Sequence, residues 1–314
     1  MNDSPYADPR VASVYNRVAA PLQFGLPARD LVRLLRLSDG ARVLDVGTGT
    51  GAVALRASAE VGPAGVVIGI DAAMAMLCFA RTTAPHRVAL AQIPGLPFPD
   101  AAFDVVTAGF VISHLADYGH GLAEMARVCR SSGRLGITSW GDMPNAAARL
   151  WSDIAGRYVS SERLDEAFRV QIPWHDRFSR LANVERALRD ADLVSVTVET
   201  REYRFTLATS DYLLSREASV QGVALRRACP PDRWTEFTRR MADAFRSRFG
   251  DTVEYVRNVH FGIGTKRCAP EPSHGSRPRG SRLRARPSGQ PLIHPRDARP
   301  HHVGRMAEAP ALAG

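Results

Sequence analysis

The segment from Val43 to Gly51 reads VLDVGTGTG, an apolar stretch that runs into three glycines spaced two residues apart. RVLDV (42–46) predicts a buried strand, and AVALRASAEV (52–61) predicts the helix that follows it. Glycines between a strand and a helix let backbone N–H groups approach a ligand closely, because no Cβ stands in the way. The segment therefore predicts an α/β fold with a ligand-binding loop at the end of a strand.

Strand and helix patterns alternate along residues 1–265. Strands are expected at 42–46, 66–71, 87–91, 103–110 and 134–140, and helices at 28–40, 52–61, 72–83 and 121–130. Residues 141–190 look mainly helical, and a helix at 231–249 separates two further strands at 195–205 and 254–264. The alternation predicts a seven-stranded, mostly parallel, Rossmann-like sheet with helices on both faces.

The overall composition is that of a globular protein. With 45% hydrophobic and 23% charged residues among 314, wholesale disorder is excluded. No run approaches the roughly 18 apolar residues of a membrane helix, and MNDSPYADPR at the N-terminus lacks the features of a signal peptide. The four cysteines are far apart, which argues against a zinc site and a disulfide framework. We therefore expect a cytoplasmic protein without a metal or a membrane partner.

The net charge of +9 is concentrated at the C-terminus. Residues 266–314 carry +7 of it, so the remainder of the chain is nearly neutral at +2. This tail is rich in arginine and proline and has no helical or strand periodicity, which predicts disorder. No aromatic residues interleave with its arginines as stacking platforms would require, so a solvated extension is favoured over a nucleic-acid contact.

The pattern of the glycine loop limits the class of ligand that it can bind. It reads G-x-G-x-G with Asp45 two residues before the first glycine, whereas a dinucleotide fingerprint reads G-x-G-x-x-G. A carboxylate here would repel a pyrophosphate but suits a cationic ligand. Asp71 ends the second expected strand, twenty residues past Gly51, where a carboxylate can accept both hydroxyls of a ribose.

Two further motifs follow the loop. Residues 96–106 read LPFPDAAFDVV, and residues 122–135 read LAEMARVCRSSGRL. With the glycine loop they resemble the class I S-adenosylmethionine-dependent methyltransferases, in particular the ubiquinone/menaquinone-type branch that acts on small molecules. The resemblance covers residues 15–140. It departs from the family at residues 129–133, where CRSSG stands in place of LxPGG and leaves Gly133 to make the turn.

The resemblance implies S-adenosylmethionine as the methyl donor. Gly47, Gly49 and Gly51 would pass beneath its methionine portion, and Asp45 would engage the ammonium directly or through water. Thr48 and Thr50 belong to the same loop, with Thr50 as a hydroxyl donor.

The second half of the donor site is implied in the same way. Asp71 would hold the ribose, with Ala72 and Met76 near the adenine. The family usually has an aspartate before LPF for the adenine amino group; Gln92 and Ile93 stand there, and the Gln92 amide oxygen can accept the same hydrogen bond. Gly109, after the fourth strand, would lie beside the transferring methyl.

The resemblance also divides the chain into five segments. Residues 1–40 are expected to form a helical lid and 41–140 the core that binds the donor. Residues 141–190 would form a helical insertion that caps the substrate, and 191–265 the strands and helices that complete the sheet. Residues 266–314 form the disordered tail.

Transfer of a sulfonium methyl needs alignment more than acid or base assistance. His114 is the candidate base, with packing beneath the loop as the alternative reading. Tyr15, like Tyr6, lies in the N-terminal segment and is a candidate for the lid or pocket, with plain packing as its alternative.

The acceptor is expected to be a small aromatic or acidic molecule. Candidate pocket residues are the aromatics Trp140, Trp151, Phe168, Trp174 and Phe178 and the cations Arg149, Arg157 and Arg177, although core and surface roles remain open for all of them. The chain resembles methyltransferases of aromatic polyketides, in antibiotic biosynthesis, and within these the aklanonic acid methyltransferases, which form a carboxyl methyl ester. C-methylation of a quinone-like ring, RNA or protein methylation through the basic tail, a nicotinamide enzyme and a non-catalytic binding protein are the alternatives.

Overall fold

The computed structural model describes residues 4–83, 86–142 and 145–268. All of them belong to one compact unit that extends from Met1 to Ala269. The predicted disorder of the tail concerns residues that lie outside the described ranges, apart from its first three.

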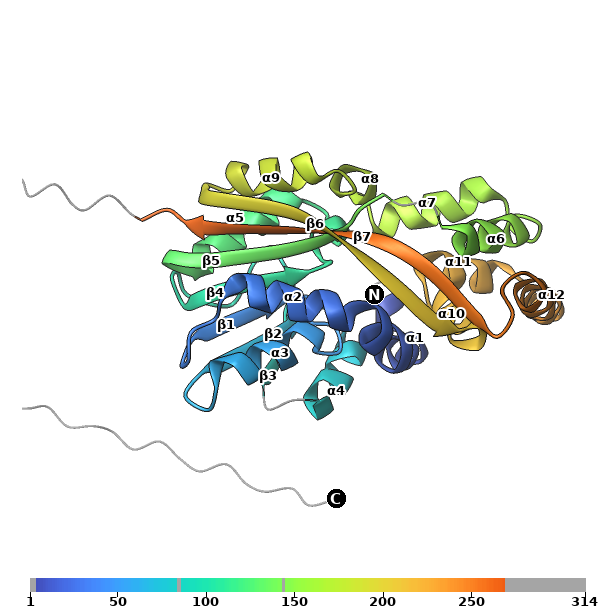
Figure 1. Ribbon diagram of the computed structural model, residues 1–314, viewed down its shortest axis with the longest axis horizontal. Coiled ribbons are helices and arrows are strands. Elements are labelled where there is room, and N and C mark those ends of the chain that lie inside the picture. The colour runs from blue at the N-terminus through green and yellow to red at the C-terminus, as the bar shows by residue number, and fades with distance from the viewer. Residues whose placement is uncertain (1–3, 84–85, 143–144, 269–314) are drawn as a thin grey trace, which may run out of the picture. The chain divides into compact units, whose positions relative to one another are not determined.

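Seven strands form one sheet in the order β3-β2-β1-β4-β5-β7-β6 (Figure 1). Strand β7 is antiparallel to both of its neighbours, and the other adjacent pairs are parallel. The strands are β1 (Arg42–Val46), β2 (Val66–Asp71), β3 (Arg87–Leu90), β4 (Phe103–Gly109), β5 (Cys129–Trp140), β6 (Leu193–Ala208) and β7 (Thr252–Lys266). The predicted seven-stranded, mostly parallel sheet is confirmed.

The described helices occupy the connections and the N-terminus. They are η1 (Pro5–Ala7), α1 (Pro9–Val14), η2 (Tyr15–Phe24), α2 (Gly25–Leu35), α3 (Ala52–Val61), α4 (Met74–Thr83), η3 (Ile112–His114), α5 (Tyr118–Val128), α6 (Ala146–Ala155), α7 (Ser161–Gln171), α8 (His175–Phe178), α9 (Leu181–Asp190), α10 (Thr209–Glu217), α11 (Val220–Ala228) and α12 (Pro231–Phe249). Helix η2 is a π-helix that contains Pro21.

The sheet is covered on both faces because successive residues of each strand point to opposite sides. In β1, Val43 packs in the cluster that contains α2 and α3, whereas Leu44 packs in the cluster that contains α5 and α9. Both side chains are fully buried. A strand buried on both sides reads as a continuous apolar run, which is why RVLDV signals an internal position.

The loop between β1 and α3 requires glycine. Gly47, Gly49 and Gly51 all have a positive φ, a region that residues with a Cβ rarely adopt. At Gly47 a Cβ would also lie 2.3 Å from Cγ2 of Val111, two residues past the end of β4. The backbone of the loop can therefore approach the β4 end only without a side chain at this position.

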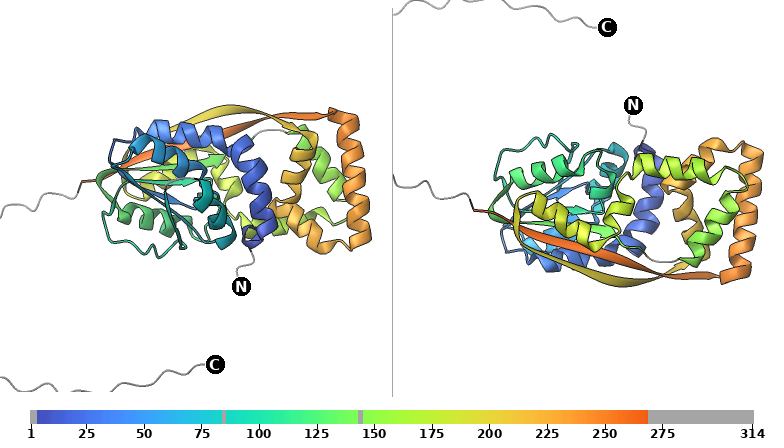
Figure 2. Two further views of the ribbon diagram at one scale, coloured as in Figure 1. Left: turned by 90° about the horizontal axis from the view of Figure 1, so that it is seen from below. Right: turned by 90° about the horizontal axis from the view of Figure 1, so that it is seen from above.

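Strands β6 and β7, with 16 and 15 residues, are the longest and continue past the others as a two-stranded ribbon (Figures 1 and 2). Beyond the sheet the ribbon contacts α6 and α10. Together with α7, α11 and α12, these are here called the distal helices. Helix α11 packs on α7, and α12 packs on α6. Helix α9, by contrast, packs on β6 and β7. The distal helices thus come both from the expected insertion, 141–190, and from the segment after it.

An ion pair fixes the connection that leads into β4. Glu124 and Arg127 of α5 bond to each other at 2.7 Å. Glu124 accepts from the Leu96 N–H, and Arg127 donates to the carbonyls of Leu96 and Phe98 and to Asp100. The motif LPFPD is therefore held against α5 by charged hydrogen bonds to its backbone, which are stronger than neutral ones.

Candidate active site

A large cavity opens at the carboxyl ends of β1, β2 and β4. It holds about 1880 Å³ of empty space, part of it open to solvent. Ligands of open α/β sheets bind at this edge. Eight of the twelve expected donor-site residues line the cavity, namely Gly47, Gly49, Asp71, Ala72, Met76, Gln92, Ile93 and Gly109. The structure therefore brings together residues from four separate connections of the sheet.

Asp71 is held in place by the backbone on both sides. Its Oδ2 accepts from the Gly49 N–H at 2.9 Å, and its Oδ1 accepts from the Ala73 N–H at 2.8 Å. Burial raises the pKa of this carboxyl, and the backbone hydrogen bonds counteract the rise. Each oxygen of a carboxylate can accept a second hydrogen bond. The group is thus oriented by the glycine loop and the start of α4 and can still bind a diol.

Asp45 is the second carboxylate and is almost completely buried at 1% exposure. Thr48 and Thr107 each donate a hydroxyl hydrogen bond of 2.7 Å to it. Burial raises the pKa of Asp45 to about 6 despite these bonds. A carboxylate that is costly to ionise in this way favours a nearby positive charge.

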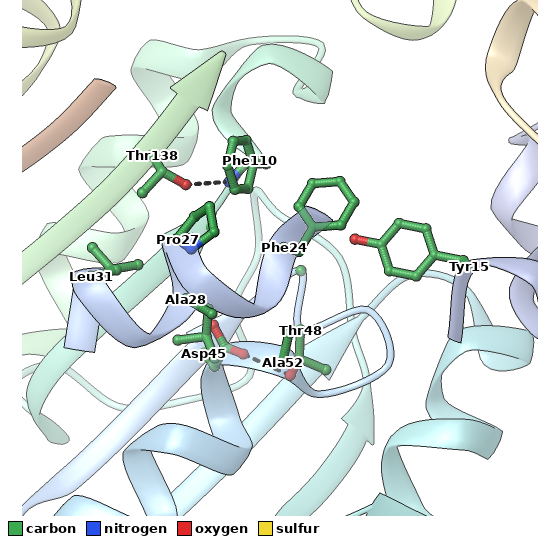
Figure 3. Close-up of a pocket in the computed structure, with 13 residues that line it drawn as sticks. Tyr15, Phe24, Pro27, Ala28, Leu31, Asp45, Thr48, Ala52, Phe110 and Thr138 are labelled. Carbon is green, nitrogen blue, oxygen red and sulfur yellow. Dashed lines mark hydrogen bonds between the residues drawn. The ribbon is translucent and has the colours of Figure 1, made fainter. Parts of the chain in front are cut away.

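Asp45 and Thr48 line a smaller pocket of about 380 Å³ (Figure 3). This pocket adjoins the large cavity, because the two share several lining residues: Tyr15, Phe24, Gly47, Gly109 and Phe110. Thr50 and Gly51 line neither space. Thr50 is buried, and Gly51 precedes α3 with its N–H bonded to the Thr48 carbonyl.

The N-terminal segment contributes aromatic rings to one side of the cavity. Tyr15 stacks on Phe24 with ring centroids 5.2 Å apart, and Tyr6 contacts Tyr15 edge-on. The Tyr15 ring also lies against Gly49, so close that a Cβ there would meet it at 3.7 Å. Burial raises the pKa of Tyr15 well above its usual range and that of Tyr6 to about 12. Both hydroxyls stay protonated at neutral pH.

His114 lies on the same wall, in the short helix η3 after β4. Its ring contacts Tyr6 at 5.8 Å and donates to the backbone carbonyl of Gln171. Burial lowers the pKa of His114 to about 4, an effect that the hydrogen bond only partly offsets. The imidazole is therefore neutral at pH 7 and a weak proton acceptor.

The cavity is also lined by some of the expected aromatic residues. Trp140 and Phe168 line it. Trp151 and Phe178 are fully buried elsewhere, and Trp174 packs on Tyr118 and donates its ring N–H to the Leu115 carbonyl. The expected cations Arg149, Arg157 and Arg177 do not line the cavity; Arg177 lies over the Tyr118 ring.

Sequence reasoning missed Arg257 and His175, which line the cavity from β7 and α8. A signal for Arg257 was present in the strand pattern. Tyr255, Val259 and Phe261 lie on the same face of β7 as Arg257, at every second position, and all three pack in the core. A cation on the core-facing side of a strand is rare and indicates a specific role.

The described residues contain no group of three or more His, Cys, Asp or Glu side chains that could hold a metal ion. Within the same ranges, every helix is too short or too polar to cross a membrane.

Comparisons with known proteins agree with this geometry. The methyltransferase-domain family matches residues 44–137. The chain is 36% identical over 134 residues to the ubiquinone/menaquinone biosynthesis C-methyltransferase of Geobacter sulfurreducens, covering 40% of this chain and 52% of that protein. It is 31% identical over 168 residues to the demethylmenaquinone methyltransferase of Listeria welshimeri, covering 48% of this chain and 71% of the relative.

A third relative acts on a different type of atom. The nocamycin O-methyltransferase of Saccharothrix syringae is 37% identical over 150 residues, covering 46% of this chain and 52% of that protein. The chain thus spans about half the length of the Geobacter and Saccharothrix proteins. A solved structure from Bacillus halodurans C-125 has the same fold, with a TM-score of 0.50 and 18% identity, covering 78% of this chain and 100% of the other.

The fold places a large cavity at the carboxyl edge of a Rossmann-like sheet, where proteins of this architecture bind nucleoside ligands. The chain belongs to the class I S-adenosylmethionine-dependent methyltransferases.

Proposed function

We propose that this protein transfers the methyl group of S-adenosylmethionine to a small planar acceptor and forms the methyl ester of an aromatic polyketide carboxylic acid. One observation carries the proposal: a single cavity joins the glycine loop and Asp71 to a wall that contains Phe110, Trp140 and Phe168. Donor and acceptor can therefore meet in one cavity, as transfer between them requires.

The residues of the donor half fit S-adenosylmethionine. Gly47 and Gly49 leave room for a ligand to lie on the loop, and the oriented Asp71 carboxylate suits the two ribose hydroxyls. Asp45, with its raised pKa, is a counter-charge for the ammonium group. Carboxylates beside the glycines favour this cation over a pyrophosphate.

The adenine would lie between α4 and the loop after β3. Ala72 and Met76 come from the start of α4, and Gln92 and Ile93 come from the loop. The Gln92 amide oxygen would accept from the adenine amino group. Gly109, which also lines the smaller pocket, would leave space for the methyl group.

The bound donor supplies a methyl group that its sulfonium centre has already activated for in-line displacement. The chain then has to hold the acceptor in line and exclude water. Tyr15 and Phe24 of helix η2 would exclude water, since their stacked rings border both the large cavity and the smaller pocket.

The side chains that line the cavity favour an acceptor that is already anionic. A phenol must lose its proton before it can attack, and its pKa is near 10. His114, with a pKa of about 4, is too weak a base for this, and the Tyr15 hydroxyl stays protonated. A carboxylate needs no base at neutral pH. His114 would then position the acceptor wall through its bond to Gln171.

The relatives support two acceptor atoms. The Saccharothrix protein is an O-methyltransferase, whereas the Geobacter protein is a C-methyltransferase of quinone biosynthesis. C-methylation of a quinone-like ring is therefore the second candidate, and it would require a base to generate the carbon nucleophile. The cavity, with its aromatic lining, supports a small molecule over an RNA or protein acceptor.

The test is product analysis by mass spectrometry. Purified protein is incubated with S-adenosylmethionine and a panel of aromatic polyketide acids and phenols, and the products are then treated with mild alkali. A methyl group lost in alkali is the expected result, because it identifies an ester. An alkali-stable methyl would contradict ester formation and favour a phenol ether or a methylated carbon. Absence of any methylated acid or phenol would contradict the polyketide proposal.

A further inference from the structure

Arg257 places a positive charge in the wall of the large cavity. It comes from β7, where it pairs with Tyr203 of β6 in the strand register. Its guanidinium carbon lies 4.0 Å from the centroid of the Trp140 ring. Burial lowers the pKa of Arg257 to about 10, so the group is still fully charged at neutral pH.

No counter-ion for this charge is found in the described part of the chain. None of the ion pairs within 4.0 Å involves Arg257, and its guanidinium makes none of the hydrogen bonds found between described residues. Asp142 acts on it electrostatically, but from beyond ion-pair distance. Arg257 is half-buried, and charges that have lost part of their hydration are normally paired, because taking an ion out of water costs free energy.

The groups near Arg257 increase the local excess of positive charge. Arg216 of α10 is half-buried, with its guanidinium carbon 4.3 Å from the centroid of the Trp151 ring, and its charge disfavours the charged form of Arg257. His175, which also lines the cavity, is neutral at pH 7 because burial lowers its pKa. Burial raises the pKa values of Tyr212 and Tyr255, which lie beside Arg257, so their hydroxyls are uncharged at pH 7. The site therefore has a net positive charge that a ligand can balance.

The orientation of Arg257 also limits the shape of that ligand. One face of the guanidinium is covered by Trp140, which in turn contacts Phe110 with ring centroids 4.4 Å apart. A stacked guanidinium keeps its N–H donors free along its edge, where they match the two oxygens of a carboxylate. The aromatic rings alongside provide a flat apolar surface for the body of the molecule.

We propose that Arg257 is the residue that recognises the acceptor, and that the acceptor is a planar aromatic carboxylate whose negative charge pairs with it. The inference rests on the proposed function, because it assigns this half of the cavity to the acceptor. It adds the substrate charge and the residue that selects it. If the paired carboxylate is the group methylated, the product ester is neutral, and the loss of the ion pair favours product release.

The test measures binding rather than turnover. Anthraquinone-2-carboxylate and the uncharged anthraquinone-2-carboxamide are titrated by calorimetry into the protein saturated with S-adenosylhomocysteine. The wild type is expected to bind the carboxylate at least tenfold more tightly than the amide. Arg257→Gln removes this preference, and Arg257→Lys keeps part of it, because an ammonium retains the charge but not the planar fork.

Arg204→Gln is the matched control, since Arg204 is an exposed arginine of β6 in the same ribbon. It is expected to keep the full preference. Circular dichroism and the Tm show whether each variant is folded, and the lysine variant provides a milder change if the glutamine variant is not.

Several outcomes would overturn the inference. Equal binding of the two compounds by the wild type, or binding of neither, contradicts an anion site. A preference that survives in Arg257→Gln assigns the selection to another residue. Loss of S-adenosylhomocysteine binding in Arg257→Gln would mean that Arg257 pairs with the carboxylate of the donor instead. Failure of methyl transfer on the acid panel would contradict the proposed function and leave the binding result unaffected.

Discussion

The Tyr203 hydroxyl of β6 donates a hydrogen bond of 2.7 Å to the carboxylate of Asp30 in α2, which lies 173 positions earlier. Arg29 and Arg201 pair with the same carboxylate at 3.0 and 3.1 Å. Burial alone would raise the pKa of Asp30, but these partners hold it below its usual value. The contact thereby joins the segment before β1 to the strand at the far edge of the sheet.

Tyr203→Phe is expected to lower the free energy of unfolding by about 1.5–3 kcal/mol, the range for hydrogen bonds to charged groups. Urea denaturation would measure it. Tyr158→Phe is the matched control, because the buried Tyr158 hydroxyl has no hydrogen-bond partner among the described residues. Equal effects of the two substitutions would contradict a role for the bond to Asp30.

Asp71→Asn is expected to weaken S-adenosylhomocysteine binding at least tenfold. The amide has one acceptor oxygen in place of two, so one of the N–H groups of Gly49 and Ala73 loses its partner and the loop loses its anchor. Calorimetric titration measures the affinity. Asp100→Asn, at an exposed carboxylate 77% accessible, should leave the affinity unchanged. Retention of normal affinity in Asp71→Asn would show that the ribose is held elsewhere.

The affinity for S-adenosylhomocysteine is expected to fall as the pH drops below about 6. The pKa of Asp45 is about 6 in the free protein, so acid neutralises the group that faces the ligand ammonium. At pH 7 and above the carboxylate is mostly charged, and the affinity should be nearly constant. Titrations between pH 5 and 8 test this, with Asp45→Asn as the comparison. A wild-type affinity as independent of pH as that of the variant would exclude the pairing.

His114 is expected to make the fold sensitive to acid. Its pKa is about 4 in the folded protein and near the usual 6.5 in the unfolded chain, so the unfolded state binds more protons between these values. Its contribution to stability is complete above pH 6.5 and is lost as the pH falls towards 4. The difference in pKa corresponds to about 3 kcal/mol as an upper value.

Urea unfolding of the wild type and of His114→Asn at pH 7 and pH 4.5 measures how much His114 contributes to the pH dependence of the free energy of unfolding. The wild type should lose more stability than the variant over this interval. His120→Asn, at an exposed position in α5, is the control and should follow the wild type. Equal losses in wild type and His114→Asn would show that His114 is not desolvated.

The core of the fold was predictable because its signals are local. The helices at 52–61 and 231–249 and the strand at 66–71 occupy the ranges that periodicity predicts. Helix α2 is different: it spans Gly25–Leu35 and ends where Arg36 adopts a left-handed φ of 45°, whereas the pattern suggested 28–40. An arginine in that conformation carries no sequence signal, unlike Gly40 four residues later.

The acceptor half of the cavity was less predictable, because it depends on which segments meet in space. The sequence makes Trp140 and Trp151 equal candidates for the pocket, yet Trp140 lines the cavity and Trp151 lies in the core. Arg257 reaches the cavity because β7 inserts between β5 and β6. That strand order follows from the packing of the whole sheet and not from any segment by itself.

The ribbon of β6 and β7 sets a rule for how related proteins can adapt to acceptors of other lengths. Each residue in a strand advances the chain by about 3.3 Å and turns the next side chain to the opposite face. Adding two residues to both strands between Arg257 and the sheet would therefore move the distal helices outward by about 7 Å with Arg257 still facing inward. Adding one residue would turn the guanidinium away. If Arg257 selects the acceptor as proposed, acceptor length can thus change only in steps of two residues, and the ribbon sets the increment for redesigning the enzyme.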